Sequence, residues 1–449
     1  MADLSTNMCG ITSPNPFWLA SGPPTNCGEQ VMRAFDAGWG GAVWKTLGEP
    51  IINVSSRLGA VDYKGNRMSG LNNIELITDR PLETNFKEIY EVKKRYPEQA
   101  LIVSLMVETR EDWKEIIKRS EDAGADGLEL NFGCPHGMCE RGMGSSVGQE
   151  PRLLKEITSW AAEFAKTPVL VKLTPNISDI LDPGIAAVEG GADGLSLINT
   201  IKSIIGVNLE SLVPMPTVRD KSTKGGYCGP AVKPIALHMV AELAKDSRVT
   251  IPISGIGGIG TWQDAAEFIA LGATTVQVCT AVMHFGYRIV EDMIDGLSNY
   301  LDEMSFKSVH DLVNRAVPKF TDWGDLDLNY KVVAEIDQDK CIGCQLCYIA
   351  CLDGAHQCIH TRKNSCNAFH GESDHGANPR FKIQEPVLHT ENGKIPEQVP
   401  LIDESECVGC NLCALICPVP DCITMVERSV GAKVETWKER LDNISNTGQ

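Results

Sequence analysis

Short apolar segments recur along residues 1–300, with helix-forming stretches between them. Four of these segments follow a glycine in nearly the same way, and they lie within Ala37–Thr46, Ala123–Asn131, Gly190–Thr200 and Leu271–Thr280. Glycine often ends a helix because it adopts the left-handed conformation without strain. An unbroken apolar run is typical of a parallel strand that is buried on both faces. The pattern therefore predicts helices that end at glycine and lead into buried strands.

Four further apolar segments bring the number of predicted strands to eight, and they are Pro16–Ser21, Ala100–Val107, Pro168–Thr174 and Ile251–Gly255. The stretches between the strands include predicted helices at Arg110–Ala123, Pro151–Ala165 and Trp262–Leu271. Eight strands in alternation with helices predict an α/β fold, a (β/α)8 TIM barrel. A doubly wound open sheet is the alternative.

Two similar cysteine runs lie in the last third of the chain: Cys341-Ile-Gly-Cys344-Gln-Leu-Cys347-Tyr-Ile-Ala-Cys351 and Cys407-Val-Gly-Cys410-Asn-Leu-Cys413-Ala-Leu-Ile-Cys417-Pro418. In bacterial-type ferredoxins the fourth cysteine of each run binds the cluster of the other run. The spacing therefore predicts one 4Fe-4S cluster on Cys341, Cys344, Cys347 and Cys417, and a second on Cys351, Cys407, Cys410 and Cys413. Zinc or disulfides would not need eight cysteines at this doubled spacing. Leu352 stands where the motif usually has proline.

The apolar pattern fades after Leu297, which suggests three parts. We predict a catalytic barrel over 1–301, a linker over 302–332, and an α+β bacterial-ferredoxin-like domain with two clusters over 333–449. The 449 residues are 43% hydrophobic, enough for a substantial core, and the net charge of −18 argues against nucleic acid or anionic lipid as a partner. No stretch approaches the roughly eighteen apolar residues of a membrane span. The N-terminus lacks a basic region followed by an apolar run, so we expect a cytoplasmic protein.

Catalytic residues of a TIM barrel lie at the carboxyl ends of its strands. The polar residues at the predicted strand ends are Ser21, Lys45, Asn131, Lys172, Asn199 and Thr200. Lys172 closes an apolar strand with a positive charge, which favours a cation that faces an anionic reduced cofactor. The alternative is a lysine whose ammonium group reaches the solvent at the rim.

The segment Gly255-Ile-Gly257-Gly258-Ile-Gly260 matches the dinucleotide-binding fingerprint. No carboxylate follows within Ala273–Ala281 to hold a ribose, however. Backbone amides after strands seven and eight of a barrel instead form a phosphate site, built here from Gly257, Gly258, Thr280 and Ala281. Such a site suits FMN, which accepts single electrons from the clusters and delivers a hydride.

Cys134 follows a predicted strand and begins a glycine-rich segment that is long enough to move as a lid. A thiol with a pKa near neutrality can donate or accept a proton, so we expect Cys134 to be the catalytic acid. His136 either tunes that thiol or anchors the loop. The remaining isolated cysteines are interpreted as small buried hydrophobic residues, and they are Cys9, Cys27, Cys139, Cys228, Cys279 and Cys422.

Several of these motifs together resemble the dihydropyrimidine dehydrogenase family over nearly the whole chain. They are Ala20-Ser-Gly-Pro-Pro-Thr25, Leu71-Asn-Asn-Ile-Glu-Leu76, Cys134-Pro-His-Gly-Met138, Glu140-Arg-Gly-Met-Gly144, Lys172-Leu-Thr-Pro-Asn176 and the two cysteine runs. The resemblance implies an FMN barrel that reduces the 5,6 double bond of uracil or thymine, with Cys134 as the proton donor to C5. It implies pyrimidine binding by Asn73, Asn131, Asn199 and Thr200. The residues expected to bind FMN are Ala20, Ser21, Lys45, Thr46, Lys172, Gly226, Gly257, Gly258, Thr280 and Ala281.

The resemblance also implies a second polypeptide, a flavoprotein with FAD that oxidises NAD(P)H and passes single electrons to the clusters, and we expect an oligomer. The segment 352–406 between the cysteine runs is longer than the family leads us to expect. It contains His356, Cys358, His360, Cys366, His370 and His375. No standard ligand spacing appears among them, so a solvated insertion is favoured over a third metal site.

Two other functions remain open. A dihydroorotate dehydrogenase has a related FMN barrel, but its cysteine loop ordinarily continues with proline and asparagine, where this chain has Pro135-His136-Gly137. That family also does not usually carry a two-cluster ferredoxin domain. The second possibility is an electron-transfer adaptor whose barrel has lost catalysis, and the full set of polar strand-end residues argues against it.

Overall fold

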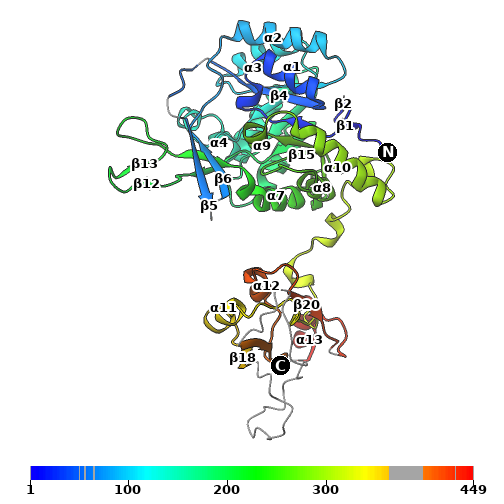
Figure 1. Ribbon diagram of the computed structural model, residues 1–449. Helices are drawn as coiled ribbons and strands as arrows, with labels where there is room; N and C mark the ends of the chain where they lie inside the picture. Colours follow the sequence, from blue (N-terminus) through cyan, green and yellow to red (C-terminus); the bar gives the residue numbers. More distant parts are fainter. Residues whose placement is uncertain are drawn as a thin grey trace, which may run out of the picture. The chain divides into compact units, whose positions relative to one another are not determined.

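The structure is a computed structural model that describes residues 2–49, 51–54, 57–63, 66–363, 398–429 and 431–447. It divides into two compact units, Met1–Phe320 and Thr321–Gln449 (Figure 1). We call them the barrel unit and the cluster unit and describe each by itself. The predicted domain limits at residues 301 and 333 stay predictions.

Eight parallel strands close into a barrel in the barrel unit. In order around the barrel they are β3 (Phe17–Leu19), β4 (Gly41–Leu47), β7 (Ala100–Leu105), β8 (Gly127–Asn131), β9 (Val169–Lys172), β10 (Gly194–Leu197), β15 (Ile253–Ile256) and β16 (Ala273–Val278). The last strand pairs with the first, Val276 opposite Phe17. This closure confirms the predicted TIM barrel and excludes the open sheet.

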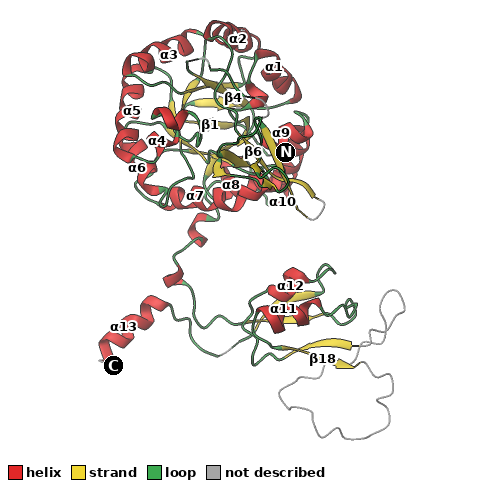
Figure 2. Ribbon diagram, turned by 90° about the vertical axis from the view of Figure 1, so that its left-hand side faces the viewer, coloured by secondary structure: helices red, strands yellow, loops and turns green. Residues whose placement is uncertain are grey.

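Helices surround these strands as a ring, which Figure 2 shows along the barrel axis. They are α1 (Gly28–Ala37), α2 (Leu82–Arg95), α3 (Arg110–Asp122), α5 (Pro151–Phe164), α6 (Leu181–Glu189), α7 (Lys233–Lys245), α8 (Trp262–Ala270) and α10 (Ile289–Glu303). Local sequence fixes several of their ends. The Thr109 hydroxyl accepts a hydrogen bond from the Asp112 amide at the start of α3, and proline occupies the first turn of α5.

Side chains alternate between the two faces of each barrel strand, so one set points outward to the helices and the other inward. The inward set has two layers. An apolar cluster that includes Trp18, Val43, Ile102 and Leu170 packs with Met8 and Ile11 of the hairpin formed by β1 (Thr6–Met8) and β2 (Ile11–Ser13). Further along the same strands the inward positions are polar. The interior is therefore sealed at the amino ends of the strands and polar at their carboxyl ends.

A second sheet, which the sequence pattern does not predict, is inserted in the loops after the strands. Its four strands in order are β11 (Ile201–Ser203), β14 (Gly225–Cys228), β6 (Asn66–Asn73) and β5 (Leu58–Tyr63). The sheet brings Asn73 opposite Gly226, across a gap of 152 intervening residues in the sequence. A small hairpin, β12 (Val207–Asn208) and β13 (Val213–Pro214), extends from the same region.

The cluster unit repeats one pattern twice, as expected for a bacterial-ferredoxin-like domain. β17 (Val332–Ile336), α11 (Leu346–Gly354) and β18 (Ile359–Lys363) form the first half. The second half consists of β19 (Gln398–Ile402), α12 (Leu412–Ile416) and β20 (Ile423–Glu427). β17 pairs with β20 and β18 with β19, so each two-stranded sheet joins both halves. A last helix, α13, spans Trp437–Thr447.

Part of the predicted insertion at 352–406 lies outside the described residues, namely 364–397, which include Cys366, His370 and His375. Among the described residues, no helix is long and apolar enough to cross a membrane.

Candidate active site and cluster cavities

A cavity of about 200 Å³ lies at the carboxyl ends of the barrel strands. It brings together nearly every residue that the sequence analysis assigns to cofactor, substrate or catalysis. These are Ala20, Ser21, Lys45, Thr46, Asn73, Asn131, Cys134, Lys172, Asn199, Thr200, Gly257, Gly258, Thr280 and Ala281. Gly226 does not line the cavity, but its neighbour Tyr227 does. Cys228 and Cys279, interpreted above as structural cysteines, also reach the wall.

Lys172 does not reach the solvent, because its side chain is 5% exposed and faces the fully buried carboxylate of Glu129 at 3.3 Å. Glu129 accepts further hydrogen bonds from Ser196 Oγ at 2.8 Å and from Gln277 Nε2 at 3.1 Å. These contacts join four strands of the barrel through one carboxylate. Charge pairing explains how a lysine remains inside the barrel.

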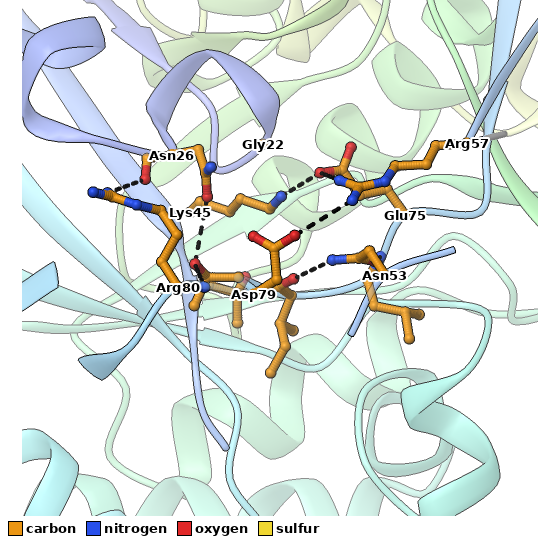
Figure 3. Close-up of polar contacts among 12 residues, drawn as sticks. Gly22, Asn26, Lys45, Asn53, Arg57, Glu75, Asp79 and Arg80 are labelled. Atoms are coloured by element: carbon orange, nitrogen blue, oxygen red, sulfur yellow. Dashed lines mark hydrogen bonds and ion pairs between the residues drawn. The ribbon is translucent and has the colours of Figure 1, made fainter. Parts of the chain in front are cut away.

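Lys45 is held by a second carboxylate from outside the barrel strands. Its ammonium group donates to Glu75, and Arg57 Nη1 lies 3.3 Å from the same carboxylate. Figure 3 shows both cations directed at Glu75, with Arg57 reaching Asp79 as well. The loop after β6 thus covers the end of β4 and fixes the position of the Lys45 charge.

Amide side chains form a chain of hydrogen bonds across the cavity wall. Asn199 Nδ2 donates to Asn131 Oδ1 at 2.9 Å, and Asn131 Nδ2 donates to Thr46 Oγ1 at the same distance. Asn73 Nδ2 donates to the Gly226 carbonyl at 3.2 Å. This network orients three amide groups at one cavity, and such groups supply both donors and acceptors to a polar ring.

Cys134 is buried at the cavity edge, and its thiol donates to the His136 carbonyl at 3.5 Å. Burial raises the pKa of Cys134 to about 11. This differs from the near-neutral pKa that the sequence suggests, because the loop closes over the thiol and removes water from it. The thiol is therefore protonated at neutral pH.

His136 anchors this loop, since its Nε2 lies 3.0 Å from the Glu75 carbonyl. Burial lowers the pKa of His136, so the ring is neutral at pH 7. The anchoring alternative for this residue therefore has direct structural support, whereas no hydrogen bond joins its ring to the Cys134 sulfur among the described residues.

The glycine run after β15 makes a tight turn that other residues could not adopt. Gly257 and Gly258 have φ of +129° and +77°, and a Cβ on Gly258 would lie 2.8 Å from Lys233 Cβ. Asp264 Oδ2 accepts hydrogen bonds from the Gly260 and Thr261 amides, which closes the end of the turn. The turn leaves backbone, without side chains, at the cavity wall, as a phosphate site requires.

The wall also fits the ring of a flavin. Gln277 Oε1 and His136 Nδ1 are buried at the cavity and find no hydrogen-bond partner among the described residues. Unpaired buried polar atoms are costly unless a ligand satisfies them. The ring of FMN carries hydrogen-bond donors and acceptors, which match the unpaired atoms of Gln277 and His136. The phosphate group of FMN matches the glycine turn.

In the cluster unit, two cavities correspond to the two predicted clusters. One is lined by Cys341, Cys344, Cys347 and Cys417, and the other by Cys351, Cys407, Cys410 and Cys413. Each cavity thus combines three cysteines of one run with the fourth of the other, the donor set of a 4Fe-4S cluster. Each also contains one further cysteine, Cys422 in the first and Cys358 in the second.

No group of three or more His, Cys, Asp and Glu residues within the described ranges could hold a single metal ion.

Sequence reasoning missed Glu75, Glu129 and Gln277 as members of the site. A signal was available for Glu129, because an acid inside the apolar strand Gly127–Asn131 is unusual. Gln277 offered a weaker signal of the same kind. Glu75 lies in a loop, where a carboxylate is ordinary.

Two family models match the chain: dihydroorotate dehydrogenase over residues 3–301 and a 4Fe-4S binding domain over residues 400–420. The NAD-dependent dihydropyrimidine dehydrogenase subunit PreA of Escherichia coli is 45% identical over 80% of this chain and 87% of its own length. The chloroplastic dihydropyrimidine dehydrogenase (NADP(+)) of Arabidopsis thaliana is 42% identical over 74% of this chain and 81% of its own. A crystal structure of dihydroorotate dehydrogenase from Eimeria tenella, with ferulenol, superposes with a TM-score of 0.58 at 22% identity, over 70% of this chain and 88% of that one, which shows a shared fold.

We expect Glu129→Gln to destabilise the barrel unit by about 3–5 kcal/mol, because it leaves the buried Lys172 charge without its counter-charge. The double variant Glu129→Gln/Lys172→Met removes both charges and should recover most of this loss. Urea unfolding followed by circular dichroism measures both. An equally large loss in the single and double variants would contradict the pairing.

Proposed function

The chain belongs to the dihydropyrimidine dehydrogenase family, and its barrel matches the dihydroorotate dehydrogenase model; from this premise we propose that it reduces the 5,6 double bond of uracil or thymine with electrons that arrive through two 4Fe-4S clusters. Its likeness to two dihydropyrimidine dehydrogenases supports the choice of substrate. The observation that carries the proposal is the combination in one chain of a buried, protonated thiol beside the barrel cavity and two cavities with ferredoxin donor sets.

In this proposal Asn73, Asn131, Asn199 and Thr200 bind the pyrimidine. Amide groups suit a planar ring on which donors and acceptors alternate. The hydrogen bonds from Asn199 to Asn131 and from Asn131 to Thr46 orient two of these amides before substrate binds. Preorganised donors reduce the free energy that binding would otherwise spend on ordering side chains.

The residues assigned to FMN above would hold this cofactor, which when bound would supply the hydride and accept electrons one at a time. Lys45 and Lys172 place two positive charges at the cavity, each held by a carboxylate. Their charges favour the binding of an anionic cofactor. Gly257 and Gly258 present backbone to the phosphate group.

Cys134 donates the proton to C5 of the pyrimidine. The raised pKa of its thiol, about 11, keeps the proton on sulfur at neutral pH until the substrate carbon takes it. The closed loop around Cys134 excludes water, so the thiol is the proton source at that position. His136 holds the loop through the Glu75 carbonyl.

Two alternatives are less well supported. The two cluster cavities favour a dihydropyrimidine dehydrogenase over a dihydroorotate dehydrogenase, since electrons for the latter need no such fused domain. A cavity with its charged, amide and thiol groups intact argues against a non-catalytic adaptor.

We place the protein in the cytoplasm, as an oligomer.

We expect Cys134→Ala to lower pyrimidine reduction by about a hundredfold or more, because it removes the general acid. The bound flavin should stay reducible, since no assigned flavin contact changes. Cys139→Ala on the same loop is the matched control, because the Cys139 thiol donates only to the Pro135 carbonyl at 3.3 Å. Rates of dihydrouracil formation measure the effect, and wild-type turnover by Cys134→Ala would refute the assignment.

Cys344→Ala or Cys410→Ala should each lose about half of the iron and stop electron delivery from a protein donor. The barrel unit should still reduce uracil with a small chemical reductant, because its cavity lies wholly within Met1–Phe320. Iron analysis and assays with both electron sources separate these effects. If either variant accepted electrons from the protein donor at the normal rate, the clusters would not be the route.

Purified chain, mixed anaerobically with NADH or NADPH and uracil, should form no dihydrouracil until a second protein is added. The only dinucleotide fingerprint in the sequence, Gly255–Gly260, is assigned here to the FMN phosphate. The partner is a flavoprotein with FAD that takes the hydride from NAD(P)H and releases single electrons to the clusters. Rapid product formation by the chain alone would show that it oxidises nicotinamide itself.

A further inference from the structure

Each cluster cavity contains five cysteines, one more than a 4Fe-4S cluster needs. The additional cysteines, Cys358 and Cys422, occupy equivalent places in the two halves of the cluster unit. Each directly precedes the last strand of its half, β18 or β20. The two thiols differ, however, in what they contact.

The Cys358 sulfur lies 3.5 Å from the sulfur of Cys351, a predicted ligand of the second cluster, and both residues are 5% exposed. The backbone fixes this approach. The Ala355 and Gln357 amides both donate to the Cys351 carbonyl, which folds the chain back over the end of α11. On the other side the Asp403 amide donates to the Cys358 carbonyl at 2.8 Å.

Cys422 is held differently. The Cys422 thiol donates to the Asp337 carbonyl at 3.6 Å, and the Asp337 amide donates to the Cys422 carbonyl at 2.8 Å. The Cys422 sulfur therefore has a backbone acceptor in addition to its contacts with the predicted ligands Cys341 and Cys417. The Cys358 sulfur contacts the predicted ligands Cys351 and Cys407.

The two cysteines that cross between clusters also have different backbones. Cys417 follows the end of α12 in an extended conformation, with φ −65° and ψ 126°, and Pro418 comes next. Proline disfavours the helical conformation in the residue before it. Leu352 replaces this proline in the first run, and α11 continues through Cys351 to Gly354. Cys351 is thus placed by a helix, and Cys358 lies beside it.

We propose that Cys358 is an alternative fourth ligand of the second cluster, able to take the iron site of Cys351. The exchange is a ligand substitution. Cys358 loses its proton to water and its sulfur bonds to iron. Where Cys351 is present, the Cys351 sulfur leaves iron and takes up a proton. No electron is gained or lost. The inference rests on the clusters and not on the pyrimidine reaction, so failure of the proposed substrate would leave it intact.

The test compares full-length Cys351→Ala, Cys358→Ala and Cys351→Ala/Cys358→Ala, all purified anaerobically. Each single variant should retain about eight iron atoms, and the double variant about four. Cys410→Ala is the control for a ligand without a neighbouring thiol, and it should match the double variant. Electron paramagnetic resonance of the reduced proteins should show two clusters in Cys351→Ala and one in the double variant. Loss of half of the iron from Cys351→Ala alone would overturn the proposal.

Cys351→Ser provides a second test if the alanine variant does not accumulate, since serine is close to cysteine in size. Ligation by Cys358 predicts iron–sulfur vibrations typical of four thiolates in its resonance Raman spectrum. These should change when Cys358→Ala is added. A spectrum that does not depend on Cys358 would show that this thiol does not bind iron.

Discussion

The buried carboxylate of Glu129 is the interaction on which the active-site cavity depends. It lies inside the barrel without solvent contact, and its partners come from three other strands: Lys172 on β9, Ser196 on β10 and Gln277 on β16. A charge in this position is tolerable only when it is paired and hydrogen-bonded. The ion pair with Lys172 and the two hydrogen bonds to Glu129 therefore fix where the Lys172 charge and the Gln277 amide face the cavity.

The division of the barrel interior into an apolar and a polar layer makes this arrangement possible. The N-terminal hairpin and Trp18 close the interior below the polar layer, so water cannot enter from the amino ends of the strands. At the other end, the inserted sheet and the Cys134 loop cover the cavity. Glu75, which follows the inserted strand β6, contacts Lys45 of the barrel strand β4 and His136 of the Cys134 loop. Burial of the thiol, and hence its raised pKa, follows from this cover.

The cluster unit depends on a different constraint, the crossing of one cysteine from each run to the cavity of the other. Because each cavity draws on both runs, and each two-stranded sheet draws on both halves, neither half can form its site alone. The halves are nevertheless not equivalent. Leu352 stands where the second run has Pro418, and α11 continues through the crossing cysteine, Cys351, whose sulfur lies 3.5 Å from that of Cys358.

The sequence by itself determined the eight barrel strands, and it grouped the eight cysteines as the two cavities of the cluster unit bring them together. Strand burial and ligand spacing are local properties, written in runs of a few residues such as Val169–Lys172 and Cys407–Cys417. Nearly all of the residues that it assigned to the site line the cavity, those at strand ends because the carboxyl ends of parallel strands meet there and the others through the family resemblance. Tertiary structure alone decided that Glu75 belongs to the site, that the Cys134 thiol is buried, and that the Cys358 sulfur lies beside that of Cys351. These facts depend on packing between segments distant in sequence or on the path of a loop, and no local pattern specifies either.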